Sequence, residues 1–325
     1  MANESRLWVN KLTSAQRIEQ IFMISQPQLR TTSRGDFYIA AYLSDSTGKI
    51  NGRMWQASEE IFRSLPDEGF VRVKGRTESY QNNLQLVIDA IGPVDTQQVP
   101  LEDFLPRTEK NIDEMFARVT EILKAIRDPH LALLAQAFLN DADLMALFKK
   151  APAAIGLHHA YLGGLLEHTL SLLELGDTVL PLYPDLNADL VLMGLFLHDI
   201  GKTVELDCDI SFKYSDQGRL LGHIVQGMFF VEEKIRELNP ADPFPGELKD
   251  ALLHIIAAHH GLREFGSPVQ PATPEAFAVH HLDNLDSKIA LSLGAIKSDP
   301  GRTHWTNYIK AIESALYKPR PHDAP

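Results

Sequence analysis

The fold of the larger part of this 325-residue chain follows from one short segment, Leu197-His198-Asp199-Ile200-Gly201-Lys202. The segment closes the apolar run Leu190–Leu197, so it places an imidazole, a carboxylate and an ammonium group at the end of a buried helix. An adjacent imidazole and carboxylate in an apolar run both need buried partners. Neutral imidazole and carboxylate are also ligands that suit divalent ions in phosphate chemistry, so the segment predicts part of a metal site.

Further histidines and an aspartate occur on both sides of this segment, each in or near a stretch with helical periodicity. They are His168, His223, His259, His260 and Asp283. Ligands so far apart in sequence converge only when the helices of a bundle point them inward. Two divalent ions about 3.5–4 Å apart can hold the attacking and leaving oxygens of a phosphate ester. We therefore expect two such ions, with Asp199 as the ligand that bridges them and as a catalytic residue.

The available donor atoms narrow the choice of metal. Cys208 is the only cysteine, which rules out a thiolate-rich zinc site. A site of nitrogen and oxygen donors suits Mn²⁺ first, with Mg²⁺, Co²⁺, Fe and Ni²⁺ as alternatives. A single cysteine, a polar N-terminus and no apolar run near the roughly 20 residues of a membrane span are typical of a cytoplasmic protein without a membrane partner.

Charge is distributed unevenly along the chain, whose net charge is −12. Residues 1–100 contain 11 Lys and Arg and 11 Asp and Glu, which leaves 20 and 32 for residues 101–325 out of totals of 31 and 43. The excess of negative charge, which disfavours a polyanionic partner, therefore belongs to the second part. Bound cations would neutralise some of it. The composition, 44% hydrophobic and 23% charged, is ordinary for a soluble globular protein.

The first hundred residues have the pattern of a small β-barrel. Short apolar-alternating runs are separated by turn residues, and they predict five strands and one short helix. The predicted strands are 18–25, 37–43, 50–55, 70–75 and 84–91, and the helix is 58–64. This order suits an OB-like Greek-key barrel, an architecture that binds single-stranded nucleic acid.

Beyond the barrel the periodicity becomes helical. Met115, Val119, Ile122 and Ile126 recur at spacings of four, three and four, which predicts an amphipathic helix. Further helices are predicted at 130–150, 159–180, 187–199, 219–238, 247–259, 274–297 and 303–317. We expect an N-terminal segment at 1–14, the barrel at 15–98, a proline-bounded linker at 99–111, an all-α bundle at 112–318 and a tail at 319–325.

The predicted barrel presents aromatic and basic side chains on one face. OB barrels bind single strands by combining a basic groove with aromatic rings on which bases stack. The candidate nucleic-acid-binding residues are Arg30, Arg34, Tyr38, Tyr42, Arg53 and Trp55. Barrels also need aromatic residues in the core, and this alternative applies most to Trp55, because a buried Tyr or Arg needs a partner for its polar tip.

The order of the ligand candidates resembles that of the HD-domain metal phosphohydrolase superfamily. The resemblance extends to Gly201-Lys202 after the dyad, to Gly222-His223-Ile224 and to Ala258-His259-His260-Gly261. With an OB-like barrel ahead of the helices, the chain is most similar to the YhaM-type 3′→5′ exoribonuclease family, over roughly residues 15–318. The resemblance implies an OB domain joined to an HD domain, and hydrolysis of single-stranded RNA from the 3′ end.

The same resemblance implies roles for single residues. His168, His198, Asp199 and Asp283 would hold one metal, and His223 and His259 would hold the other with Asp199 shared. Which of His259 and His260 binds metal stays open, because neighbours on a helix point about 100° apart. Lys202 would contact a substrate phosphate oxygen as a second catalytic residue. Asp286 is a reserve ligand, three positions after Asp283, whereas His254, His280 and His281 are expected to be core residues.

Three functions compete at this point. The first is a metal-dependent exonuclease acting on single-stranded RNA or DNA, with the barrel feeding the strand to the bundle. The second is a phosphohydrolase of small nucleotides or cyclic dinucleotides, since a fold does not determine its substrate. The third is a non-catalytic single-strand-binding protein, which the full set of ligand candidates disfavours.

Overall fold

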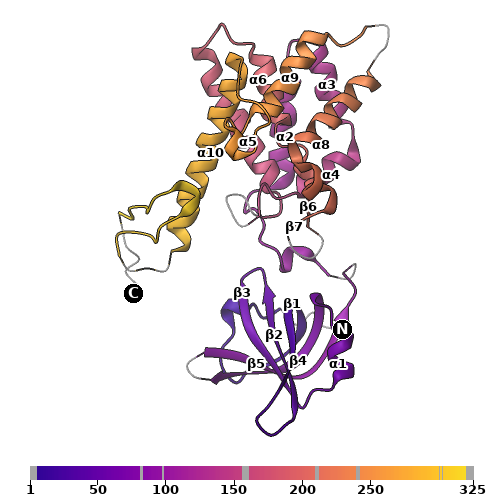
Figure 1. The fold of residues 1–325 in the computed structure, drawn as a ribbon, viewed down its shortest axis with the longest axis vertical. Coiled ribbons are helices and arrows are strands. Elements are labelled where there is room, and N and C mark those ends of the chain that lie inside the picture. Colours follow the sequence, from indigo (N-terminus) through magenta and orange to yellow (C-terminus); the bar gives the residue numbers. More distant parts are fainter. Residues whose placement is uncertain are drawn as a thin grey trace. The chain divides into compact units, whose positions relative to one another are not determined.

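The computed structural model describes residues 6–80, 83–96, 99–155, 161–208, 212–238, 242–299, 301 and 303–319. The chain forms two compact units, one with residues 1–107 and 208–211 and one with residues 108–207 and 212–325. The first unit is built around strands and the second around helices (Figure 1). The predicted linker at 99–111 is divided between the units, and most of the predicted tail lies outside the described residues.

The first unit is the closed five-stranded barrel that the sequence predicts. Its strands are β1 (Arg17–Thr31), β2 (Phe37–Asp45), β3 (Gly48–Trp55), β4 (Glu68–Tyr80) and β5 (Asn83–Val94), each longer than its predicted range. The strand order around the barrel is β1-β2-β3-β5-β4, and β4 pairs again with β1. Only β3 and β5 pair in parallel among these strands. This is the OB-like topology, with helix α1 (Glu59–Ser64), capped by Ser58, between β3 and β4.

Alternating side chains fill the barrel interior. Phe22, Ile24, Ile39 and Leu43 are fully buried. The intervening residues of β2 and β3 face outward, as period-two strands require. The start of the predicted linker also packs on this unit, because Phe104 contacts Phe70 edge to face at 4.9 Å between ring centroids.

The second unit is a helical bundle. Its helices are α2 (Ile112–Lys124), α3 (Pro129–Leu139), α4 (Ala142–Lys150), α5 (Gly164–Val179), α6 (Ala188–Leu197), α7 (Lys202–Glu205), α8 (Asp216–Glu237), α9 (Gly246–Ala258) and α10 (Pro274–Ser298). The single helix predicted at 130–150 is wrong: α3 ends at Leu139, and the carboxylate of Asp141 accepts from the Leu144 amide to begin α4. A short two-stranded sheet, β6 (Leu206–Asp207) and β7 (Lys213–Tyr214), precedes α8.

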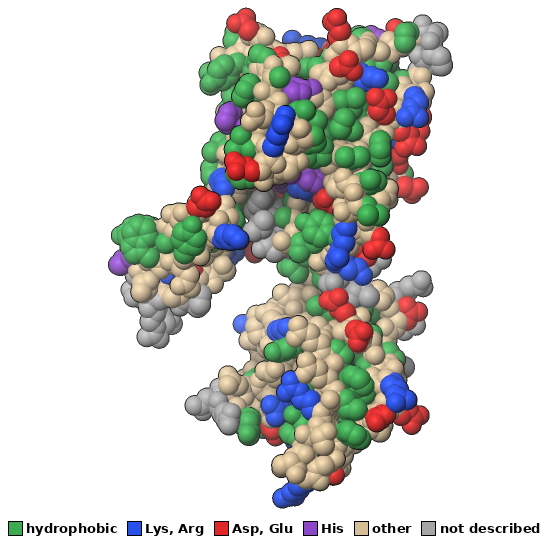
Figure 2. Space-filling view, viewed as in Figure 1, with side chains coloured by type: hydrophobic (Ala, Val, Ile, Leu, Met, Phe, Trp, Pro, Cys, Tyr) green, Lys and Arg blue, Asp and Glu red, His purple; other side chains and the backbone are tan. Residues whose placement is uncertain are grey.

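The helix predicted at 303–317 is also wrong. This segment pairs with itself through the bridges Trp305–Tyr317 and Ile309–Ser314, and only Lys310–Ile312 forms a 3₁₀ turn. The hydroxyl of Thr306 accepts from the Leu316 amide, so a polar side chain offers the backbone an alternative to helical bonds. Hydrophobic side chains are visible on the surface of this C-terminal part in Figure 2, where Trp305, Tyr308 and Tyr317 are more than half exposed.

The bundle core surrounds α6, whose residues Leu190–Leu197 are all buried. A helix that is apolar on every side occupies the centre of a bundle. Around it pack α5 and α10, which contain His168 and Asp283, and α9, which His259 and His260 follow. His223 lies on α8. No single helix of the described ranges is long and apolar enough to cross a membrane, although α3 and α4, bent by 77°, pass that test as a pair.

Candidate metal centre and nucleic-acid groove

The end of the central helix α6 orients the first candidate ligand. His198 is the C-cap residue of α6, and its Nδ1 donates a hydrogen bond of 2.9 Å to the carbonyl oxygen of Leu195. That bond sets the tautomer and leaves Nε2 as the ring nitrogen that can bind a metal. Nε2 lies 3.3 Å from Oδ2 of Asp199, the next residue.

Three helices contribute a first group of ligand atoms, from His168, His198 and Asp283. Their atoms all lie within 4.8 Å of one another. Nε2 of His168, on α5, is 3.2 Å from Oδ1 of Asp283, on α10. The other ring nitrogen of His168 donates to Asp286 Oδ2 at 2.8 Å. Asp286 therefore supports His168 from the outside of the group, which differs from the reserve ligand role considered for it.

A second group consists of His223, His259 and His260, whose ligand atoms also lie within 4.8 Å of one another. His223 follows Gly222, where α8 is interrupted. His259 donates through Nδ1 to the carbonyl oxygen of Ile256 at 2.7 Å, and His260 donates through Nδ1 to that of Phe265 at 2.8 Å. Each of these adjacent histidines thus has one hydrogen-bonded ring nitrogen and one that can bind a metal. The sequence left the choice between His259 and His260 open, and the structure places both in this group.

Asp199 lies between the two groups. Its Oδ2 is 3.3 Å from His198 Nε2 and 3.9 Å from His168 Nε2. Its Oδ1 is 3.4 Å from His223 Nε2 and 3.6 Å from His259 Nε2. One carboxylate oxygen therefore faces each group, which is the arrangement that a bridging ligand of two ions requires.

The ligand atoms fit a divalent metal. Among the described side chains, Nε2 of His198, His223 and His259 and Oδ1 of Asp199 are buried without a hydrogen-bond partner. Buried polar atoms are nearly always hydrogen-bonded, and each unpaired one costs about 1–3 kcal/mol. Four such atoms converging on the same space, all nitrogen or oxygen, are explained by coordination to divalent metal.

The charges around Asp199 keep the site ionised. Burial raises the pKa of Asp199, but its interactions with Lys202, His198 and His223 together outweigh burial and hold the pKa well below its usual range. The Lys202 ammonium lies 2.6 Å from Oδ2 of Asp199, which raises the pKa of Lys202 against the opposing effect of burial. Burial lowers the pKa of His168, yet its hydrogen bonds to Asp283 and Asp286 raise it to about 9.

Two glycines allow the backbone around the ligands to pack closely. A Cβ at Gly201, in the His-Asp segment, would overlap the carbonyl oxygen of His223. Gly261 follows the histidine pair with a φ of 78°, and a Cβ there would overlap the ring of His280. A larger residue at either position would displace a ligand histidine or its neighbour.

Sequence patterns did not reveal two side chains that support the ligands. Glu205, at the end of α7, accepts from both the amide and the Nδ1 of His223, at 2.9 and 3.1 Å. His280 donates through Nδ1 to the carbonyl oxygen of His259 at 2.7 Å. It is half-buried and His281 is exposed, so the expectation that both are core residues is wrong. No fixed spacing links such partners to the ligands, since they meet only through the fold.

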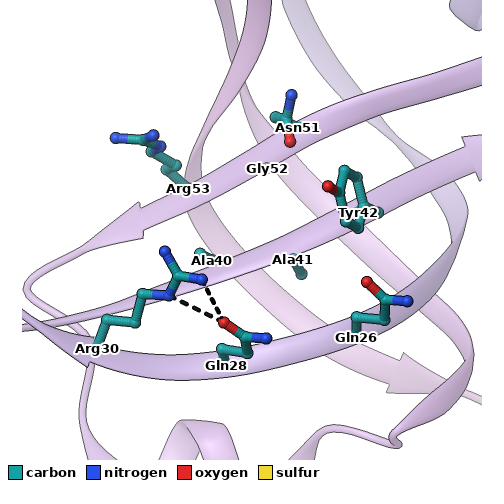
Figure 3. A pocket seen from close by; sticks show the side chains of 9 residues that line it. All are labelled: Gln26, Gln28, Arg30, Ala40, Ala41, Tyr42, Asn51, Gly52 and Arg53. Atoms are coloured by element: carbon teal, nitrogen blue, oxygen red, sulfur yellow. Dashed lines mark hydrogen bonds between the residues drawn. The ribbon is translucent and has the colours of Figure 1, made fainter.

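The barrel has a groove on the face where nucleic-acid contacts are predicted. The groove has a volume of about 200 Å³ and is lined by β1, β2 and β3. Its lining includes Arg30, Tyr42 and Arg53, whose side chains stand on one face of the sheet in Figure 3. The guanidinium of Arg30 donates to Gln28 Oε1, which orients one cation along the groove.

The remaining candidates lie beside the groove. Trp55 is 43% exposed, so it is not a core residue, and its ring contacts that of Tyr38 at 5.0 Å between centroids with the planes tilted by 34°. The guanidinium of Arg53 lies 5.8 Å from the centroid of the Trp55 ring. Arg34 occupies the exposed turn between β1 and β2, apart from the lining residues. The outward face thus combines aromatic rings in contact with each other and cations.

Known proteins are similar to this chain in both of its units. A family model described as HD domain matches residues 165–288. A 3'-5' exoribonuclease YhaM of Geobacillus sp. (strain WCH70) is 32% identical over 307 residues, 94% of this chain and 92% of the relative. The 3'-5' exoribonuclease YhaM of Halalkalibacterium halodurans is 31% identical over 311 residues, 95% of each chain.

Among solved structures, the second OB-fold domain of replication protein A from Methanococcus maripaludis is 16% identical, covering 27% of this chain and 94% of that chain with a TM-score of 0.23. The similarity to the two exoribonuclease relatives covers both the barrel and the bundle, so it shows the family of the whole chain. The predicted resemblance is confirmed, and the chain belongs to the YhaM family of 3'-5' exoribonucleases.

Proposed function

We propose that this protein is a divalent-metal-dependent exoribonuclease that shortens single-stranded RNA from its 3′ end by hydrolysis. The proposal rests on the position of Asp199, whose two oxygens each face a separate group of three ligand atoms. The names of the two relatives, 3'-5' exoribonuclease, support the direction and the RNA substrate. Single-stranded DNA is a second proposed substrate.

Seven residues would hold two ions. His168, His198 and Asp283 would hold one, and His223, His259 and His260 the other, with Asp199 shared. When bound, the ions would supply Lewis-acid activation of water and stabilise charge on the leaving oxygen. We propose Mn²⁺ for both positions, because imidazole and carboxylate donors without thiolate suit it.

The protein's own groups would position the ligands and the substrate phosphate. Glu205 and Asp286 each accept from the outer nitrogen of a ligand histidine, which keeps the inner nitrogen free to bind metal. Lys202 lines the cavity above the ligands and keeps its charge through its proximity to Asp199. We assign Lys202 the role of neutralising a non-bridging oxygen of the substrate phosphate.

The barrel would supply affinity for the strand. Cations at Arg30 and Arg53 suit the phosphate backbone, and Tyr42 and Trp55 offer exposed rings for bases. Tyr38 contacts Trp55 beside the groove, and Arg34 adds a cation in the turn between β1 and β2. Since the bundle contains the chain's excess of negative charge, the barrel and the bound ions would provide most of the attraction for RNA. We also propose a cytoplasmic location, since Cys208 is the only cysteine.

End-labelled RNA tests the proposal. A single-stranded oligoribonucleotide labelled at either its 3′ or its 5′ end is incubated with the protein, with and without Mn²⁺. We expect the 3′ label to appear at once in a mononucleotide, and the 5′ label to pass through a ladder of shorter strands. Uncut RNA together with hydrolysis of small nucleotides or cyclic dinucleotides would instead establish a small-molecule phosphohydrolase. Binding without any hydrolysis would establish a strand-binding protein.

A further inference from the structure

Several candidate ligands line a cavity of about 540 Å³. Asp199, Lys202, His259 and Asp283 are among its lining residues, so any substrate phosphate at the metals would enter it. Its volume falls within the roughly 300–1,000 Å³ that is typical of small-molecule sites. The cavity therefore has room for more than the phosphate itself.

One wall of this cavity is apolar although it faces solvent. Leu262 is 40% exposed and Phe265 is 64% exposed, and both line the cavity. An exposed phenylalanine contributes little to folding, because most of its surface stays in water. A large exposed apolar side chain beside a reactive centre indicates a contact with a ligand.

Hydrogen bonds hold the segment that forms this wall in place. Arg263–Phe265 forms a 3₁₀ turn that ends at Gly266, and the Ser267 amide donates back to the carbonyl oxygen of Leu262 at 3.3 Å. The carbonyl oxygen of Phe265 also accepts from Nδ1 of His260 at 2.8 Å. The aromatic residue is thus connected through one hydrogen bond to a candidate metal ligand.

A polar part of the lining comes from α10. It presents Asn284, Ser287 and Lys288, and Lys288 is held by a 2.8 Å hydrogen bond to the carbonyl oxygen of Ala311. The apolar residues, the polar residues and the cation of Lys202 in this lining match the parts of a nucleotide: a flat base, hydroxyl groups and a phosphate. Inorganic phosphate or a small aliphatic ester would leave the apolar wall unused.

We propose that Phe265 stacks on the base of the 3′-terminal nucleotide, with Leu262 extending the apolar contact, and so positions the scissile phosphate over the metals. Phe265 is a positioning residue in this role. The inference rests on the proposed exonuclease function and adds the way in which the strand end is held. Base stacking on an aromatic side chain is sequence-tolerant, because every base has a flat face.

The test pairs protein variants with substrate variants. Phe265→Ala, Phe265→Tyr and the wild type are compared on two oligoribonucleotides that differ only in whether the 3′-terminal ribose has a base. Stacking is worth roughly 5- to 150-fold in an equilibrium or rate constant. We expect Phe265→Ala to lower kcat/KM by a factor in this range on normal RNA. On the abasic strand we expect the variant and the wild type to react at the same rate, and Phe265→Tyr to retain normal activity.

Phe277→Ala is the matched control, since Phe277 is 49% exposed in the same unit and does not line the cavity. The bound metal per chain is measured for each protein, and we expect no change, because His260 donates to the backbone of residue 265. The inference is overturned if Phe265→Ala degrades normal RNA at the wild-type rate. It is also overturned if the substitution lowers kcat/KM by the same factor on the abasic strand as on normal RNA. If the wild type does not shorten RNA from the 3′ end, the proposed function itself fails, and the two failures are distinguishable.

Discussion

Replacing Asp199 by asparagine tests the shared-ligand arrangement most directly. The carboxylate lies 3.3 to 3.9 Å from ring nitrogens in both ligand groups, so one substitution weakens both metal positions. Loss of a residue that merely orients a ligand typically costs 10- to 100-fold in metal affinity. A ligand shared by two ions should cost more than about 100-fold, and activity should fall to background.

The same substitution also removes the charge partner of Lys202. Breaking a buried ion pair by removing one partner costs about 3–5 kcal/mol, and the partial exposure of Lys202 favours the lower end. In a domain of this size, 1 kcal/mol changes Tm by roughly 2–4 °C. We therefore expect metal-free Asp199→Asn to melt about 6–12 °C below the metal-free wild type, while the fold survives.

Three measurements follow from this: metal per chain after dialysis, hydrolysis of bis-p-nitrophenyl phosphate with Mn²⁺, and Tm without metal. Asp177→Asn, which alters only an exposed ion pair with Arg118, is the control. Asp286→Asn should lower metal affinity 10- to 100-fold, which is more than Asp177→Asn and less than Asp199→Asn. An Asp199→Asn protein with the wild-type metal content and turnover would refute the shared-ligand arrangement.

Other properties of the site and the groove lead to three further predictions. Glu205→Gln should lower metal affinity 10- to 100-fold in metal titrations, because Glu205 orients His223; an unchanged affinity would show that Glu205 only supports the fold. Combining Tyr42→Ala with Arg53→Ala should weaken binding of a long oligoribonucleotide in anisotropy assays but spare hydrolysis of bis-p-nitrophenyl phosphate, and equal losses in both would contradict the feeding role. The pKa of His168 is raised to about 9 in the metal-free protein, so the protonated ring adds at most about 3 kcal/mol to the free energy of unfolding. This contribution is fully present below pH 6.5 and is lost as the pH rises through 9. Urea denaturation of metal-free protein at pH 6.5 and 9.5 should show this loss in the wild type and a smaller one in His168→Gln.

Local patterns were enough to find most of the secondary structure. Period-two alternation located all five strands, and helical periodicity located most helices. These signals act within a few residues, which is why they can be recognised without the fold. The exceptions are segments where a polar side chain accepts a hydrogen bond from a backbone amide and so competes with regular helical hydrogen bonding. Asp141 divides one predicted helix, and Thr306 supports a paired loop in place of another.

The kind of site could be predicted from the residues alone. The types and order of its histidines and aspartates are enough to predict a divalent metal pair, since ligand chemistry depends on the donor atoms. How these residues are divided between the two groups became clear only from the fold. It places His259 and His260 together in one group, directs one oxygen of Asp199 to each group, and brings Glu205 to His223 and Phe265 to His260. Distances between side chains on different helices depend on how those helices pack, and that packing is a property of the whole core.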